Sequence, residues 1–70
     1  MPYLVRYYVC NPNNPNIGNW EVYGLYERLS QAIRHYKRLQ EECAFTNKYR
    51  QSSKVTKFQI LQNNEVITEC

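Results

Sequence analysis

The chain has 70 residues and a mass of 8.5 kDa. A chain of this length buries only about 60% of the surface that it exposes when unfolded, so we expect a single domain spanning residues 1–70 with one small core. This size excludes a two-domain enzyme, a complete dinucleotide-binding fold and a barrel. Apolar residues make up 43% and charged residues 21%, which is typical of a folded domain, and a formal net charge of +3 is ordinary for one.

Tyrosine is over-represented, with seven residues. Tyrosine packs well in half-buried strands and is also enriched at protein interfaces, so both roles stay open. The three cysteines, Cys10, Cys43 and Cys70, are few and widely spaced, which indicates free thiols in the cytoplasm, although one bridge from Cys10 stays open. The sequence has neither a long apolar run nor a basic start followed by an apolar stretch, so we expect no membrane span and no secretory signal.

The first predicted element is a strand over Tyr3–Cys10, which is rich in β-branched and aromatic residues. Its alternation places Val5, Tyr7 and Val9 on the face toward the core. Arg6 belongs to the opposite face, which should meet water or a partner because a buried arginine is costly. The following segment, Asn11–Asn19, has five Asn, two Pro and one Gly, and this composition predicts a loop.

A second strand is predicted over Trp20–Glu27, and it pairs with the first as an antiparallel hairpin. Its alternation directs Trp20, Val22 and Tyr26 toward the core. Gly24 inside this strand marks either a bulge or a close approach of the helix.

From Leu29 the apolar residues follow the i, i+3, i+4, i+7 spacing of an amphipathic helix. The apolar stripe consists of Leu29, Ala32, Ile33, Tyr36, Leu39, Gln40 and Cys43. Ser30 is the candidate N-cap, and the helix is expected to end between Phe45 and Tyr49.

The last two predicted strands, Val55–Gln62 and Glu65–Cys70, flank Asn63–Asn64. Two asparagines can occupy the positive-φ corners of a type I′ turn, so this segment predicts a tight hairpin. Its register would place Ile60 opposite Ile67 and Leu61 opposite Val66, with Ile60 and Ile67 facing the core.

The predicted order is β-β-α-β-β, an α+β two-layer sandwich in which one helix covers one face of a four-stranded antiparallel sheet. The second sheet face would stay uncovered, and an exposed apolar patch of this kind marks an interaction surface. The residues expected there are Leu4, Arg6, Tyr8, Tyr23, Leu25, Leu61 and Val66. The alternative is that loops or chain ends cover this face, or that the alternation of one strand is shifted by one residue.

The sequence lacks the groupings that catalysis or metal binding requires. His35 is the only histidine, and there is no C-x-x-C, H-E-x-x-H or G-x-S-x-G motif. We therefore expect no enzyme, no metal site and no cofactor. A thiol-based redox role for Cys10 or Cys43 is a weaker third hypothesis.

The leading hypothesis is a small non-enzymatic protein-interaction module, an adaptor, regulator or inhibitor, which binds a protein partner or a second copy of itself through the open sheet face. The alternative is a nucleic-acid-binding protein, because the segment from Cys43 to Asn64 contains no acidic residue. The candidate residues of this alternative site are Lys48, Tyr49, Arg50, Lys54 and Lys57. The same basic residues are also typical of a solvated loop.

Overall fold

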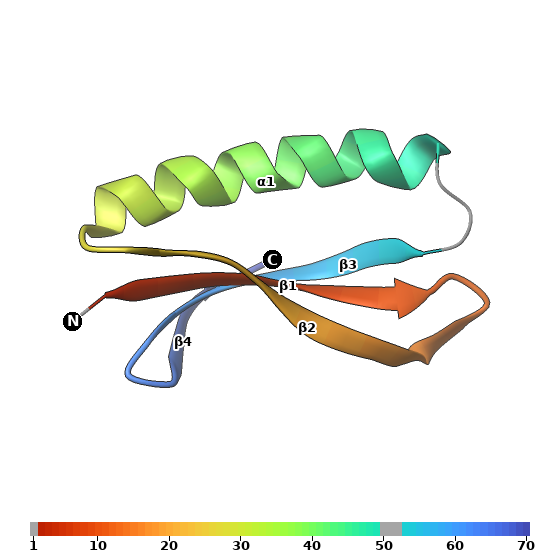
Figure 1. Ribbon diagram of the computed structural model, residues 1–70, viewed down its shortest axis with the longest axis horizontal. Helices are drawn as coiled ribbons and strands as arrows, with labels where there is room; N and C mark the ends of the chain where they lie inside the picture. Colours follow the sequence, from red (N-terminus) through yellow and green to blue (C-terminus); the bar gives the residue numbers. More distant parts are fainter. Residues whose placement is uncertain (1, 50–52) are drawn as a thin grey trace.

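A computed structural model describes residues 2–49 and 53–70, with the backbone alone for residues 45–49. The elements are β1 (Tyr3–Asn11), β2 (Asn14–Tyr26), α1 (Leu29–Tyr49), β3 (Lys54–Gln62) and β4 (Glu65–Glu69). The strands form one antiparallel sheet in the order β2-β1-β3-β4, and α1 lies along one face of it (Figure 1). The predicted α+β fold and its element order are confirmed.

The core lies between α1 and the two central strands of the sheet. Val5 on β1 and Ile60 on β3 oppose each other and are both fully buried. The buried side chains of α1 that cover them are Ala32, Tyr36, Leu39 and Cys43. This is the centre of the predicted helical stripe, whereas Leu29 and Ile33 at its margin are 40% and 37% exposed.

α1 starts two residues earlier than an N-cap at Ser30 predicts. The helix begins at Leu29, and the backbone N–H of Ala32 donates to the carbonyl oxygen of Arg28 at 3.1 Å. Ser30 therefore lies inside the first turn, and its assignment as the N-cap is wrong. The His35 ring stacks on the Tyr26 ring with centroids 4.4 Å apart, which packs the helix against the end of β2.

The predicted loop over Asn11–Asn19 is wrong for most of its length, because β2 already begins at Asn14. The chain reverses at Pro12–Asn13, where the side-chain oxygen of Asn11 accepts a hydrogen bond from the backbone N–H of Asn13 at 2.9 Å. The Asn- and Pro-rich composition marked this turn correctly. It did not exclude a strand afterwards, because β2 is an edge strand and needs backbone pairing on one side only.

A bulge in β2 decides which of its side chains face the helix. Val5 pairs with Gly24, but the next residue of β1, Arg6, pairs with Val22, so Tyr23 is an extra residue in the ladder. One inserted residue reverses the alternation of every residue before it. The sequence signal at Gly24 thus marked a real bulge, which lies one position earlier.

The bulge overturns three placements that simple alternation predicts. Trp20 pairs with Tyr8 and Val22 pairs with Arg6, so both lie on the face away from α1 and not in the core. Tyr23, expected on that outer face, instead packs against the core cluster.

The β3–β4 hairpin turns at Asn63 and Asn64, whose φ angles are 53° and 65°. These left-handed conformations confirm the predicted type I′ turn. Leu61 pairs with Val66 as predicted. Ile60, however, pairs with Thr68, because a register shift leaves Ile67 unpaired, and Ile67 is 43% exposed instead of lying in the core.

Candidate functional site

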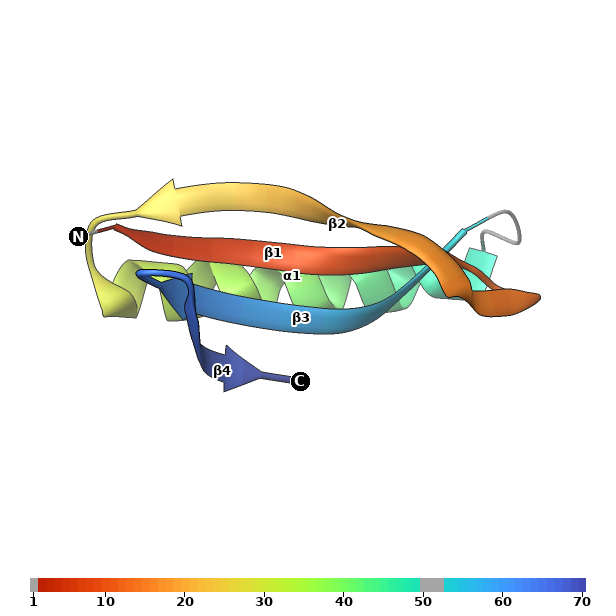
Figure 2. The same cartoon turned by 90° about the horizontal axis from the view of Figure 1, so that it is seen from below.

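Among residues 2–49 and 53–70, no helix lies on the sheet face opposite α1; α1 runs behind β1 and β3 when the molecule is seen from this side (Figure 2). Paired residues of neighbouring strands share a face, so the register defines this surface, which we call the open face. Its residues are Leu4, Arg6, Tyr8, Cys10, Gly18, Trp20, Val22, Leu25, Lys54, Lys57, Gln59, Leu61, Val66 and Glu69. Of the residues predicted for protein binding, all lie here except Tyr23.

An aliphatic row crosses one end of the open face. Its four members pair in succession from β2 to β4, and they are Leu25, Leu4, Leu61 and Val66. The two outer members are exposed, Leu25 by 64% and Val66 by 45%, whereas Leu61 is buried between its neighbours. This row is the most apolar part of the surface.

A hydrogen-bonded row crosses the middle of the open face. The Nε of Arg6 donates to the side-chain oxygen of Gln59 at 2.7 Å, and the side-chain nitrogen of Gln59 donates to a carboxylate oxygen of Glu69. Gln59 is buried although it is polar, and these two bonds satisfy both ends of its amide. The row therefore holds Arg6 in one orientation.

An aromatic row lies next to it. The Tyr8 and Trp20 rings have centroids 5.3 Å apart and are tilted by 57°. The guanidinium carbon of Arg6 lies 4.3 Å from the Trp20 centroid, and the Nζ of Lys57 lies 5.6 Å from the Tyr8 centroid. Both distances are within the range of cation–π attraction. Sequence reasoning missed Trp20, because only the bulge brings it to this face.

The open face has an excess of positive charge. It carries three cations, Arg6, Lys54 and Lys57, against the single carboxylate of Glu69, which is occupied by Gln59. Within residues 2–49 and 53–70, the ion pair found joins Arg38 to Glu42 on α1, and none involves an open-face cation.

The structure joins part of the predicted nucleic-acid site to the open face. Lys57 pairs with Tyr8 and Lys54 pairs with Cys10 across β1 and β3. Arg50 and the side chains of Lys48 and Tyr49 lie outside the described residues.

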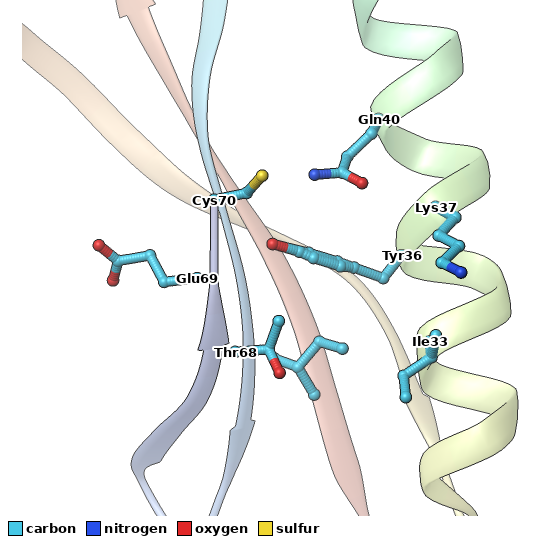
Figure 3. A pocket seen from close by; sticks show the side chains of 8 residues that line it. Ile33, Tyr36, Lys37, Gln40, Thr68, Glu69 and Cys70 are labelled. Carbon is cyan, nitrogen blue, oxygen red and sulfur yellow. The ribbon is translucent and has the colours of Figure 1, made fainter.

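A second feature is a groove of about 180 Å³ between α1 and β4 (Figure 3). Ile33, Ile60 and Tyr36 form its apolar lining, and the hydroxyl of Tyr36 points toward Cys70, whereas the carboxylate of Glu69 points away. The Tyr36 hydroxyl donates to the carbonyl oxygen of Phe58 at 3.2 Å. Burial raises the pKa of Tyr36 to about 12, and the neighbouring Cys70 and Glu69 act in the same direction.

The cysteines are all free thiols; Cys10 and Cys43 are buried, and Cys70 is exposed. Burial raises the pKa of Cys43, and the nearby Glu42 carboxylate adds to this effect, so the nucleophilic thiolate is disfavoured. Among the described residues, no group of three or more His, Cys, Asp or Glu side chains is arranged to hold a metal ion. In the same part of the chain, no helix has the length and apolar character needed to cross a membrane.

None of the protein-family models, curated proteins or solved structures compared with the chain matches it.

Proposed function

We propose that this protein is a small non-enzymatic interaction module, an adaptor, regulator or inhibitor, that binds a protein partner through the open face. The observation that carries the proposal is that exposed apolar side chains gather on the one sheet face that α1 leaves uncovered. Val22 and Leu25 are more than 60% exposed there, and Trp20 is 37% exposed. Exposed apolar surface combined with tryptophan, tyrosine and arginine is the composition of interface hot spots.

The open face is also suited to binding because its polar groups are already ordered. Arg6 is fixed between Gln59 and the Trp20 ring. A partner that meets side chains already held in one conformation loses less conformational entropy on binding. We include a cytoplasmic location in the proposal, since three free thiols are typical of a reducing compartment.

The test is affinity capture from the native host with three forms of the full chain. Trp20→Ala with Leu25→Ala removes apolar area from the open face, and the matched control, Leu29→Ala with Ile33→Ala, removes similarly exposed apolar area from α1. We expect at least one protein to be retained by the natural chain and the control but lost with the open-face variant. The same retained proteins on all three forms would contradict the proposal.

A nucleic-acid-binding function is the second candidate, because Lys54 and Lys57 lie on the same face as Tyr8 and Trp20. Aromatic rings beside cations are the elements with which sheets bind single strands. This function requires binding of oligouridylate at low salt that weakens steeply as salt is raised. An absence of binding at about 50 mM salt would exclude it.

A further inference from the structure

We propose that the partner presents an acidic segment that also carries aliphatic side chains, and that its carboxylates bind Arg6 and Lys57 on the open face. The inference rests on the proposed function and specifies the chemistry of the partner. Arg6 lies on β1 and Lys57 on β3, which are the two central strands, so the positive charge is at the middle of the surface. A partner that covers this surface has to neutralise it.

Neither Arg6 nor Lys57 forms an ion pair with a carboxylate within the described part of the chain. Arg6 uses its Nε for Gln59 and lies over Trp20, and neither contact neutralises its charge. Its terminal N–H groups have no hydrogen-bond acceptor among the described residues. Such a guanidinium can bind a carboxylate through two parallel hydrogen bonds.

The open face also differs in chemistry from one end of β1 to the other. The aliphatic row pairs through Leu4 and the aromatic row through Tyr8, four residues further along β1. Four residues of a strand span about 13 Å. The matching partner therefore carries aliphatic side chains at one end of its binding segment, one carboxylate about 7 Å away at Arg6 and another about 13 Å away at Lys57.

A second copy of this chain fits the surface poorly. A two-fold axis through the middle of two facing open faces would bring Arg6 and Lys57 near their own copies, and like charges in contact are unfavourable. A nucleic acid also fits less well. The Trp20 and Tyr8 rings, on which bases would stack, already have Arg6 and Lys57 over them, and the aliphatic row has no counterpart on a phosphate backbone.

The experiment selects binders from a library of short random peptides displayed on phage, with the full natural chain immobilised. The open-face variant is Arg6→Gln with Lys57→Gln. The matched control is Arg34→Gln with Lys37→Gln, which removes the same charge from α1. Circular dichroism establishes that each variant is folded; if Arg6→Gln unfolds the chain, Lys54→Gln with Lys57→Gln replaces it.

We expect the selected peptides to combine Asp or Glu with aliphatic residues. They should bind the open-face variant at least about tenfold more weakly than the natural chain, and bind the control equally well. Added salt should weaken the binding of the natural chain more than that of the open-face variant.

Enriched peptides without acidic residues would overturn this inference, but the proposed function would stand if their binding were lost with Trp20→Ala and Leu25→Ala. If the binding of the selected peptides is unaffected by every open-face substitution, both the inference and the proposed function are overturned. Failure to enrich any peptide would overturn the inference, and binding of oligouridylate in its place would favour the nucleic-acid function.

Discussion

Val5 and Ile60 face each other across β1 and β3, and neither side chain is exposed to solvent. They form the centre of the core, with Ala32 and Tyr36 of α1 packed in the same cluster. Because a small domain has only a few kcal/mol of net stability, the loss of one such contact is a large fraction of the total.

Truncation of Ile60 should destabilise the protein far more than truncation of a side chain on the open face. Ile60→Ala leaves a cavity and should lower the free energy of unfolding by about 2–5 kcal/mol. Val22→Ala, at a residue 62% exposed, should change it by less than about 0.5 kcal/mol. Urea titration followed by circular dichroism measures both, and equal effects would contradict the assignment of faces.

The type I′ turn predicts opposite effects for two substitutions of one residue. Asn64 has a φ of 65°, which glycine adopts without cost, so Asn64→Gly should leave stability unchanged or slightly higher. Asn64→Val should cost about 1–2 kcal/mol, because a β-branched residue is strained in this conformation. The thermal unfolding midpoints of the two variants test the turn. If Asn64→Val does not lower the midpoint, the type I′ turn is excluded.

The three thiols should react at very different rates with an alkylating reagent. Cys70 is exposed, whereas Cys10 and Cys43 are buried and burial also raises the pKa of Cys43. In the native protein we expect Cys70 to be modified first, and in denaturant all three should react alike. Mass spectrometry of a time course with iodoacetamide identifies the site, and early modification of Cys43 would contradict the packing of α1.

Stability should fall at alkaline pH through Tyr36. Its pKa is raised from 10.0 to about 12 in the folded chain. Between these two values the unfolded chain loses the proton and the folded chain keeps it, so rising pH favours unfolding. Tyr36→Phe should reduce this dependence on pH. Near neutral pH it should cost about 1 kcal/mol, because the hydrogen bond to Phe58 is lost.

The control for this prediction is Tyr8→Phe, at a tyrosine on the opposite face of the sheet. This variant should keep the alkaline loss of the natural chain. Burial also raises the pKa of Tyr7 and Tyr26, so Tyr36→Phe should retain part of the pH dependence. If the free energy of unfolding of the Tyr36→Phe variant falls with alkaline pH as steeply as that of the natural chain, the Tyr36 hydroxyl of the natural chain is not buried.

The candidate site was only partly predictable from the sequence. The sequence indicated an uncovered sheet face and placed Leu4, Arg6 and Tyr8 on it, because no extra residue interrupts β1 between Leu4 and Tyr8. It could not show that Arg6 lies over Trp20, since that contact joins two strands whose register had to be known first.

The order of the elements, the buried stripe of α1 and the type I′ turn follow from the sequence alone, because each depends on residues that are close in the chain. The tertiary structure decided the faces of β2. The bulge at Tyr23 exists only in the pairing of β2 with β1, and one extra residue there exchanges core and surface for the side chains from Trp20 to Val22. The periodicity within one strand cannot reveal such a shift, because the shift concerns how two strands pair and not the pattern of residues within either of them.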